Sequence, residues 1–129
     1  MMSVVRFLKS PDTSIDDDEE RFFEGLRDAV NLCWPDADAS LRVLRNDGVS
    51  CMILEGGRWP EQMRSIRRFL ADCRSVVERA VANGMSICID LVVTRDDIGA
   101  NVISLELCPA DLRILADAGV SLELSVSCF

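Results

Sequence analysis

Histidine and tyrosine are both absent from the 129-residue chain. Histidine is the side chain that most often serves as a general base at neutral pH. Its absence excludes Ser-His-Asp and Cys-His catalysis. An enzyme made from this chain would have to work with carboxylates, arginines or a cysteine alone. We therefore expect a binding protein without catalytic residues and without a cofactor.

Long apolar runs are also lacking. No stretch approaches the roughly 18 apolar residues that span a membrane. The segment from Met1 to Lys9 carries two charges and lacks the apolar run of a signal peptide. We therefore expect a cytoplasmic protein. Because 49% of the residues are apolar, the chain has ample material for one core, and residues 1–129 are expected to form a single domain.

The cysteines lack paired spacing. No CxxC occurs, and a cytoplasmic compartment is reducing, so disulfides are not expected. A zinc site is not expected either, because four thiolates would have to converge without the usual spacing. Free cysteine behaves as a small buried hydrophobe. We expect that role for all six, which are Cys33, Cys51, Cys73, Cys88, Cys108 and Cys128.

Positive charge is scarce. The net charge is −8, and Lys9 is the single lysine. An acidic surface repels the phosphate backbone of nucleic acids and anionic membranes. We expect neither of these as a partner. A basic protein surface remains the favoured partner, and a homodimer remains an option.

Hydrophobic periodicity predicts nine elements. Period-two patterns and β-branched residues indicate strands over 3–8, 41–45, 49–55, 85–93, 102–107 and 120–126. Apolar residues at helical spacing indicate helices over 16–34, 60–83 and 109–119. The order β-α-β-β-α-β-β-α-β predicts an α+β fold with a ferredoxin-like start. The expected sheet is mixed or mainly antiparallel, with helices packed mostly on one face.

Turn residues support these boundaries. Asn46-Asp47-Gly48 is a strong hairpin signal between two of the strands. Trp34 precedes a proline and should end the first helix, with its ring in the core. Asn83-Gly84 should cap the second helix, and Gly119 should end the third. In that third helix the residues expected to pack inward are Leu112, Leu115 and Ala116.

An acidic segment over 12–38 is the first candidate for a functional surface. It carries ten acidic and two basic side chains. One interpretation is a solvated helix start, where the helix dipole favours negative charge. The other is a contact for a basic partner. A metal site is a third option, although the adjacent aspartates lack calcium-loop spacing. The candidate contacts are Asp16, Asp17, Asp18, Glu19, Glu20 and Glu24.

Arginines of the second helix form the second candidate. Arg64, Arg67 and Arg68 share one helical face at spacings of three and four residues. Residues 58–79 carry a local net charge of +3. One interpretation is a solvated face that pairs with nearby acids such as Glu61, Asp72 and Glu78. The other is an anion site or a contact for an acidic partner surface.

The loop Gly56-Gly57-Arg58-Trp59-Pro60 is the third candidate. It lacks the Gly-Lys-Ser/Thr of a phosphate loop. Exposed tryptophan and arginine are typical binding anchors, so Arg58 and Trp59 join the candidate partner contacts. The alternative for Trp59 is a position that caps the core beneath the loop.

Carboxylates in or near strands are the fourth candidate. A buried Asp90 would have a shifted pKa and could act as an acid or base. The alternative is an ion pair with an arginine or an outward-facing position. Asp96-Asp97 lies in an expected polar turn.

The segment from Met85 to Phe129 has a recognisable order of strand and helix patterns. Ile-Cys-Ile-Asp-Leu-Val-Val is followed by Val-Ile-Ser-Leu-Glu-Leu, a short helix and Val-Ser-Leu-Glu-Leu-Ser-Val. This order of patterns resembles that of small bacterial immunity proteins, which neutralise toxins delivered between competing bacteria. The resemblance implies a cognate toxin as partner and supplies no catalytic residue. Two alternatives stay open: a self-associating structural or regulatory subunit that uses the last strand as an edge, and a small-ligand binder or carboxylate-based enzyme.

Overall fold

The computed structural model describes residues 1–9, 17–35, 40–41, 48–99 and 104–127. The strands are β1 (Met2–Leu8), β2 (Ser40–Leu41), β3 (Gly48–Glu55), β4 (Ser86–Thr94) and β5 (Val120–Ser127). The helices are α1 (Asp17–Cys33), α2 (Trp59–Asp72), α3 (Arg74–Ala82), α4 (Arg95–Ile98) and α5 (Pro109–Ala118).

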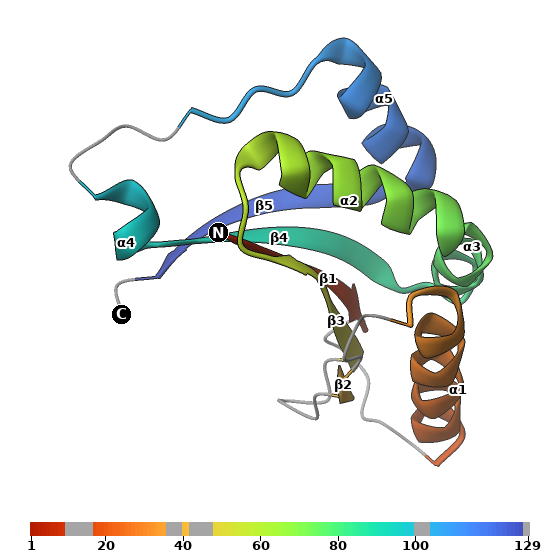
Figure 1. The fold of residues 1–129 in the computed structure, drawn as a ribbon. Helices are drawn as coiled ribbons and strands as arrows, with labels where there is room; N and C mark the ends of the chain where they lie inside the picture. Colours follow the sequence, from red (N-terminus) through yellow and green to blue (C-terminus); the bar gives the residue numbers. More distant parts are fainter. Residues whose placement is uncertain (10–16, 36–39, 42–47, 100–103, 128–129) are drawn as a thin grey trace.

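The five strands form one mixed sheet in the order β2-β3-β1-β4-β5 (Figure 1). Neighbouring strands are antiparallel except β4 and β5, which are parallel. Strand β3 lies between β1 and β2, as in a split βαβ arrangement. The α+β class and the mixed sheet agree with the sequence-based prediction.

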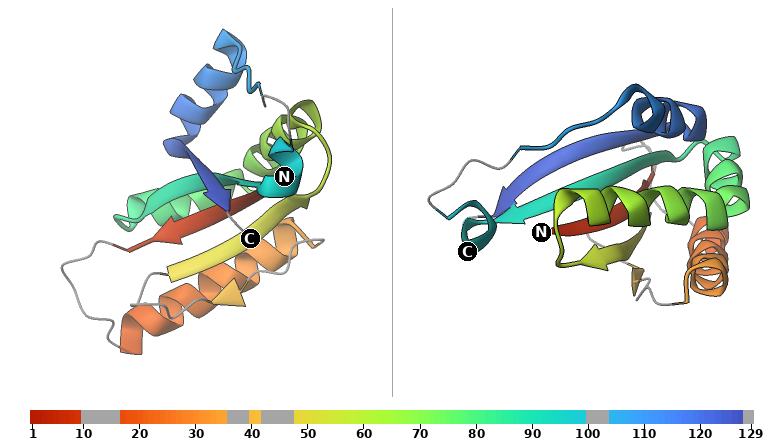
Figure 2. Two further views of the ribbon diagram at one scale, coloured as in Figure 1. Left: turned by 90° about the vertical axis from the view of Figure 1, so that its left-hand side faces the viewer. Right: turned by 45° about the horizontal axis from the view of Figure 1, so that its top comes forward.

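One face of the sheet is covered by α1, α2, α3 and α5 (Figure 2). Side chains of a strand point alternately to its two faces. In β1 this alternation buries Ser3, Val5 and Phe7 under the helices and leaves the residues between them half-buried. The core therefore lies between this face and the helix layer.

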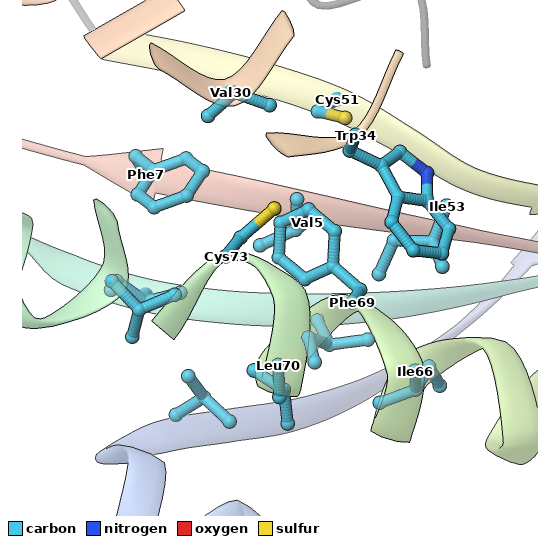
Figure 3. Close-up of a cluster of buried hydrophobic side chains, with 14 of the residues drawn as sticks. Val5, Phe7, Val30, Trp34, Cys51, Ile53, Ile66, Phe69, Leu70 and Cys73 are labelled. Atoms are coloured by element: carbon cyan, nitrogen blue, oxygen red, sulfur yellow. The ribbon is translucent and has the colours of Figure 1, made fainter. Parts of the chain in front are cut away.

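Phe69 of α2 is fully buried at the middle of this core. Figure 3 shows side chains from β1, β3, α2 and the end of α1 gathered around it. The ring of Trp34 meets Phe69 edge to face, with 5.5 Å between centroids. Trp34 is buried, as the sequence predicted.

A buried amide fixes the start of α2 against β1. The Gln62 side chain donates to the backbone carbonyls of Met1 (3.1 Å) and Gly56 (2.6 Å). Its oxygen accepts a hydrogen bond of 2.6 Å from the Ser3 hydroxyl. Both Gln62 and Ser3 are fully buried. All polar atoms of this amide therefore have partners in the protein.

The predicted element order fails in the C-terminal third. Residues 104–107 form no strand. Leu105 and Leu107 are half-buried and alternate with exposed residues, which explains the strand-like pattern. The position beside β4 is taken by β5, so this segment does not pair with β4. Instead Trp59 Nε1 donates a hydrogen bond of 2.8 Å to the carbonyl of Glu106.

Three helical details also differ from the prediction. The expected second helix is interrupted at Cys73, whose φ of −106° separates α2 from α3. The expected polar turn after β4 contains the single helical turn α4. In α5, Leu115 is buried as expected, but Leu112 and Ala116 are exposed. The helix is rotated relative to the prediction, so that Asp111 faces inward together with Leu115.

Other boundaries were predicted well. Helix α3 ends before Asn83-Gly84, and the left-handed Gly119 ends α5. Leu41 pairs with Val49 in an antiparallel bridge, so β2 and β3 are neighbours as the hairpin signal indicated. The remainder of that hairpin loop lies outside the described residues.

A disulfide joins Cys33 to Cys73, with 5.4 Å between their Cα atoms. The prediction that all cysteines are free was therefore wrong for this pair. The end of α1 and the α2–α3 junction meet only in the folded chain, so the spacing of cysteines along the sequence does not predict the pair. Cys51 and Cys88 are buried as expected, whereas Cys108 is exposed. Cys128 lies outside the described residues.

No helix in the described part of the chain is long and apolar enough to cross a membrane.

Removing the Gln62 amide should lower the stability of the fold strongly. Gln62→Met should lower the free energy of unfolding by about 3 kcal/mol, because the three hydrogen bonds of the amide, to Ser3, Met1 and Gly56, are lost. Ser3→Ala is the matched control and should cost about 1 kcal/mol, since it removes one of the three bonds. Urea unfolding followed by circular dichroism measures both. Equal small losses would contradict the role given to the amide.

The disulfide closes a loop with a sequence separation of 40 residues. Loop-closure entropy predicts that breaking it lowers stability by about 4 kcal/mol. A reductant should therefore lower the melting temperature of the natural protein. The double variant Cys33→Ala/Cys73→Ala should melt low with or without reductant, whereas Cys108→Ser should respond like the natural protein. Identical melting of the natural protein in both conditions would disprove a stabilising bridge.

Candidate partner-binding surface

Helix α1 carries acidic side chains on its outer side. Glu20, Glu24 and Asp28 are exposed and follow one another at four-residue spacing, so they lie along one side of the helix. The opposite side buries Phe23 and Leu26 against the core. We call the three exposed carboxylates the acidic face of α1.

An exposed leucine continues this row. Leu32 follows Asp28 by four residues and is 86% exposed. Leu32 falls outside the apolar stripe that packs on the sheet, and that offset is the sequence signal that could have found it. A helix surface that combines charge with an uncovered apolar side chain is typical of a protein contact.

The other acidic candidates are only partly placed. Asp17, Asp18 and Glu19 lie in the first turn of α1. Asp16 lies outside the described residues. Within the acidic face, Asp28 accepts a long ion pair of 3.4 Å from Arg27, so it is the least free of the three carboxylates.

Trp59 is not an exposed anchor. It is 7% exposed, begins α2 and packs into the core. Pro60 follows within the first helical turn, and that start directs the indole inward, where Glu106 accepts its hydrogen bond. The alternative in which Trp59 caps the core is the one that the structure shows.

Arg58 is exposed, but it is far from the acidic face. Its backbone amide donates to the Glu61 carboxylate at 3.2 Å as the cap of α2. Figure 1 shows α1 beside α3. Arg58 instead directly precedes the start of α2, at the end of that helix away from α3. The structure therefore does not bring Arg58 together with the acidic candidates.

The arginines of α2 and α3 mostly have partners within the protein. Arg68 stacks over Trp34, with its guanidinium carbon 5.0 Å from the ring centroid, and pairs with Asp72 at 3.5 Å. Arg74 pairs with Glu78 at 2.9 Å. These contacts favour the interpretation of a solvated, internally paired face over that of an anion site.

Arg67 makes the shortest of these ion pairs, 2.6 Å to Asp111 of α5. The Cys108 side chain and Arg67 both donate to this carboxylate, and they hold the pKa of Asp111 below its ordinary value. Asp111 is buried between α2 and α5, so the pair ties these helices together. The sequence could not place it, because the partners are 44 residues apart.

A groove of about 370 Å³ lies between α2, α3 and α5. Charged and apolar side chains both line it. The charged ones are Arg67, Arg74, Glu78 and Asp117, and the apolar ones are Leu70, Ala71, Val77, Ile114 and Ala118. The two arginines are already paired with Asp111 and Glu78.

Asp90 lies on the sheet face that α1, α2, α3 and α5 leave uncovered, yet it is 1% exposed. Arg6 covers it and donates to one carboxylate oxygen at 2.8 Å. This confirms the alternative of an ion pair with an arginine. The other oxygen is buried and has no hydrogen-bond partner among the described residues.

Two further groups stand beside Asp90. Glu123 lies opposite it in the β4–β5 register, and the Cys88 thiol donates to Glu123 at 3.5 Å. Burial, with Glu123 and Asp90 contributing, raises the pKa of the Cys88 thiol. The reactive form of cysteine is the thiolate, so this shift disfavours Cys88 as a nucleophile.

Asp97 serves α4 rather than an acid–base pair. The N-terminal ammonium of Met1, together with the amide and hydroxyl of Thr94, lowers the pKa of Asp97 to about 2. It is therefore ionised at neutral pH. In the part of the chain that the structure describes, no three His, Cys, Asp or Glu side chains gather as a metal site would require.

Comparisons with protein families, with curated proteins and with solved structures found no match.

The Arg67–Asp111 pair makes a testable statement about pH. Arg67→Ala should raise the pKa of Asp111 part of the way to its ordinary 3.8, since the Cys108 bond remains. A lowered pKa means that the carboxylate stabilises the fold above pH 3.8 and that this stabilisation is lost as the pH falls through the folded-state value. Carboxyl NMR titration measures the shift.

Arg74→Ala is the matched control for this titration. Its partner Glu78 lies at the surface, so the titration of Asp111 should not change. If Arg67→Ala left the pKa of Asp111 unaltered, the ion pair would have no part in lowering it.

Proposed function

We propose that this chain is an immunity-type protein that binds a cognate bacterial toxin domain and neutralises it by occlusion, without catalysis. The observation that carries the proposal is the acidic face of α1 continued by the exposed Leu32. Rigid helices present such groups in a fixed geometry, so little conformational entropy is lost on binding.

Electrostatics supports a basic partner surface. The chain carries a net charge of −8, and several of its described arginines face acids or aromatic rings of the same chain. The acidic face of α1 is free to attract opposite charge. Complementary charge speeds association and suppresses wrong partners. A toxin that acts on a polyanion has a basic active site, and an acidic helix laid over that site would exclude its substrate.

Nucleic acids and membranes are not part of the proposal, because both would be repelled by this surface. A cytoplasmic location remains a prediction. Disulfides persist mainly in oxidising compartments. The fraction of Cys33–Cys73 that is oxidised in protein from its native host therefore tests the location directly.

The second candidate function is a self-associating subunit. Its support is the position of β5 at one edge of the sheet. A small-ligand binder remains the third candidate, with the groove between α2, α3 and α5 as its site.

Neutralising the acidic face should weaken toxin binding. We expect Glu20→Gln/Glu24→Gln/Asp28→Asn to lower affinity for the toxin encoded beside this gene by about tenfold at low salt, since three exposed charge contacts are lost. The salt dependence of the association rate should flatten as well. Surface plasmon resonance measures both, and survival of toxin-expressing cells reports neutralisation.

The control variant removes the same charge elsewhere. Asp96→Asn/Glu106→Gln/Asp117→Asn changes three exposed acids away from α1 and should bind almost normally. Leu32→Ser should weaken binding without unfolding the chain, whereas Val81→Ser, another exposed apolar change, should not. If both triple variants weakened binding equally, only net charge would matter and the acidic face would not be the contact.

A further inference from the structure

Strand β5 forms one edge of the sheet. It pairs with β4 on one side only, and no other described segment bonds to its outer edge. It is eight residues long, whereas the described strand at the opposite edge, β2, has two. An edge strand presents unpaired backbone N–H and C=O groups to any strand that can align with them.

Most of the usual protections of an edge are missing from β5. It contains no lysine, no proline and no bulge in its register with β4, and its single charge is Glu123. Proteins normally blunt a long edge with such features to avoid pairing between chains. Their absence indicates an edge that is meant to be covered.

Apolar side chains are uncovered at the same edge. Leu124 and Val126 are 56% and 57% exposed. They lie opposite Leu91 and Val93 of β4, which are almost fully buried on the helix side of the sheet. The helix layer thus covers β4 here and leaves the end of β5 open (Figure 2).

We infer that two copies of this chain pair through β5, antiparallel, about a two-fold axis at Leu124, to form a continuous ten-stranded sheet. Directly opposed residues of antiparallel strands point to the same face. Leu124 then meets the partner's Leu124, and Val126 meets the partner's Leu122. The exposed apolar side chains of both copies form one strip along the helix side.

Charge excludes one of the neighbouring registers. On the other face, Glu123 lies opposite the partner's Ser125. Shifting the axis by one residue, to Glu123, would oppose Glu123 to the partner's Glu123. Like charges directly opposite each other destabilise a strand pair. In the register centred on Leu124, no like charges oppose each other and the exposed Leu124 side chains of the two copies meet.

The inference goes beyond the proposed function. Helix α1 contacts β2 and β3, on the side of the sheet away from β5 (Figure 1). Pairing through β5 leaves the acidic face of both copies free, one at each end of the dimer. Such a dimer would hold two partner molecules.

Sedimentation equilibrium of the full chain over a concentration series tests the dimer. We expect a mass of twice the chain mass of 14.3 kDa at the higher concentrations. Leu124→Glu should weaken dimerisation by about tenfold or more, because two carboxylates would meet on the axis. Leu112→Glu makes the same change at an exposed leucine of α5 and should not. Circular dichroism checks that both variants fold.

Cysteine cross-linking tests the register. In a background with Cys108 and Cys128 replaced by serine, Leu124→Cys should form a disulfide-linked dimer under mild oxidation, and Glu123→Cys should not. A monomer at every concentration would overturn the inference, and so would equal effects of the two glutamate variants. Cross-linking through position 123 alone would overturn the register. Loss of dimerisation with unchanged toxin binding would separate this inference from the proposed function.

Discussion

The buried amide of Gln62 is the contact on which the arrangement of sheet and helices depends. It joins β1 through Ser3, the end of β3 through Gly56, and the start of α2. A buried polar group is stable only when its hydrogen bonds are satisfied, so the three elements cannot shift independently. Once α2 is anchored there, Phe69 reaches the middle of the core and Trp59 turns inward.

The fold divides its charges unequally. Most arginines of α2 and α3 are paired with Asp72, Glu78 or Asp111 or lie over aromatic rings. The carboxylates along α1 have few such partners. The sequence has an acidic stretch and a basic stretch. In the folded protein much of the positive charge is paired within the molecule, whereas the negative charge along α1 is mostly unpaired. That asymmetry favours a basic partner.

The two surfaces proposed as contacts lie at opposite edges of the sheet. The acidic face of α1 flanks β2 and β3, whereas β5 ends the sheet at the other edge. One presents charge with a single exposed leucine, and the other presents backbone groups with an apolar strip. The two call for different partners, and occupying one leaves the other accessible.

The sequence alone determined most strands, the helix ends at Gly84 and Gly119, the burial of Trp34 and the exposed acids of α1, because periodicity, turn chemistry and charge are local properties. It misassigned residues 104–107, since alternation records which side chains are buried and not whether a neighbouring strand exists. The inward position of Trp59, the Cys33–Cys73 bridge, the pairing of Arg6 with Asp90 and the exposure of Leu32 and Leu124 were decided by tertiary structure. Each depends on which distant segments meet, and packing of the whole chain settles that.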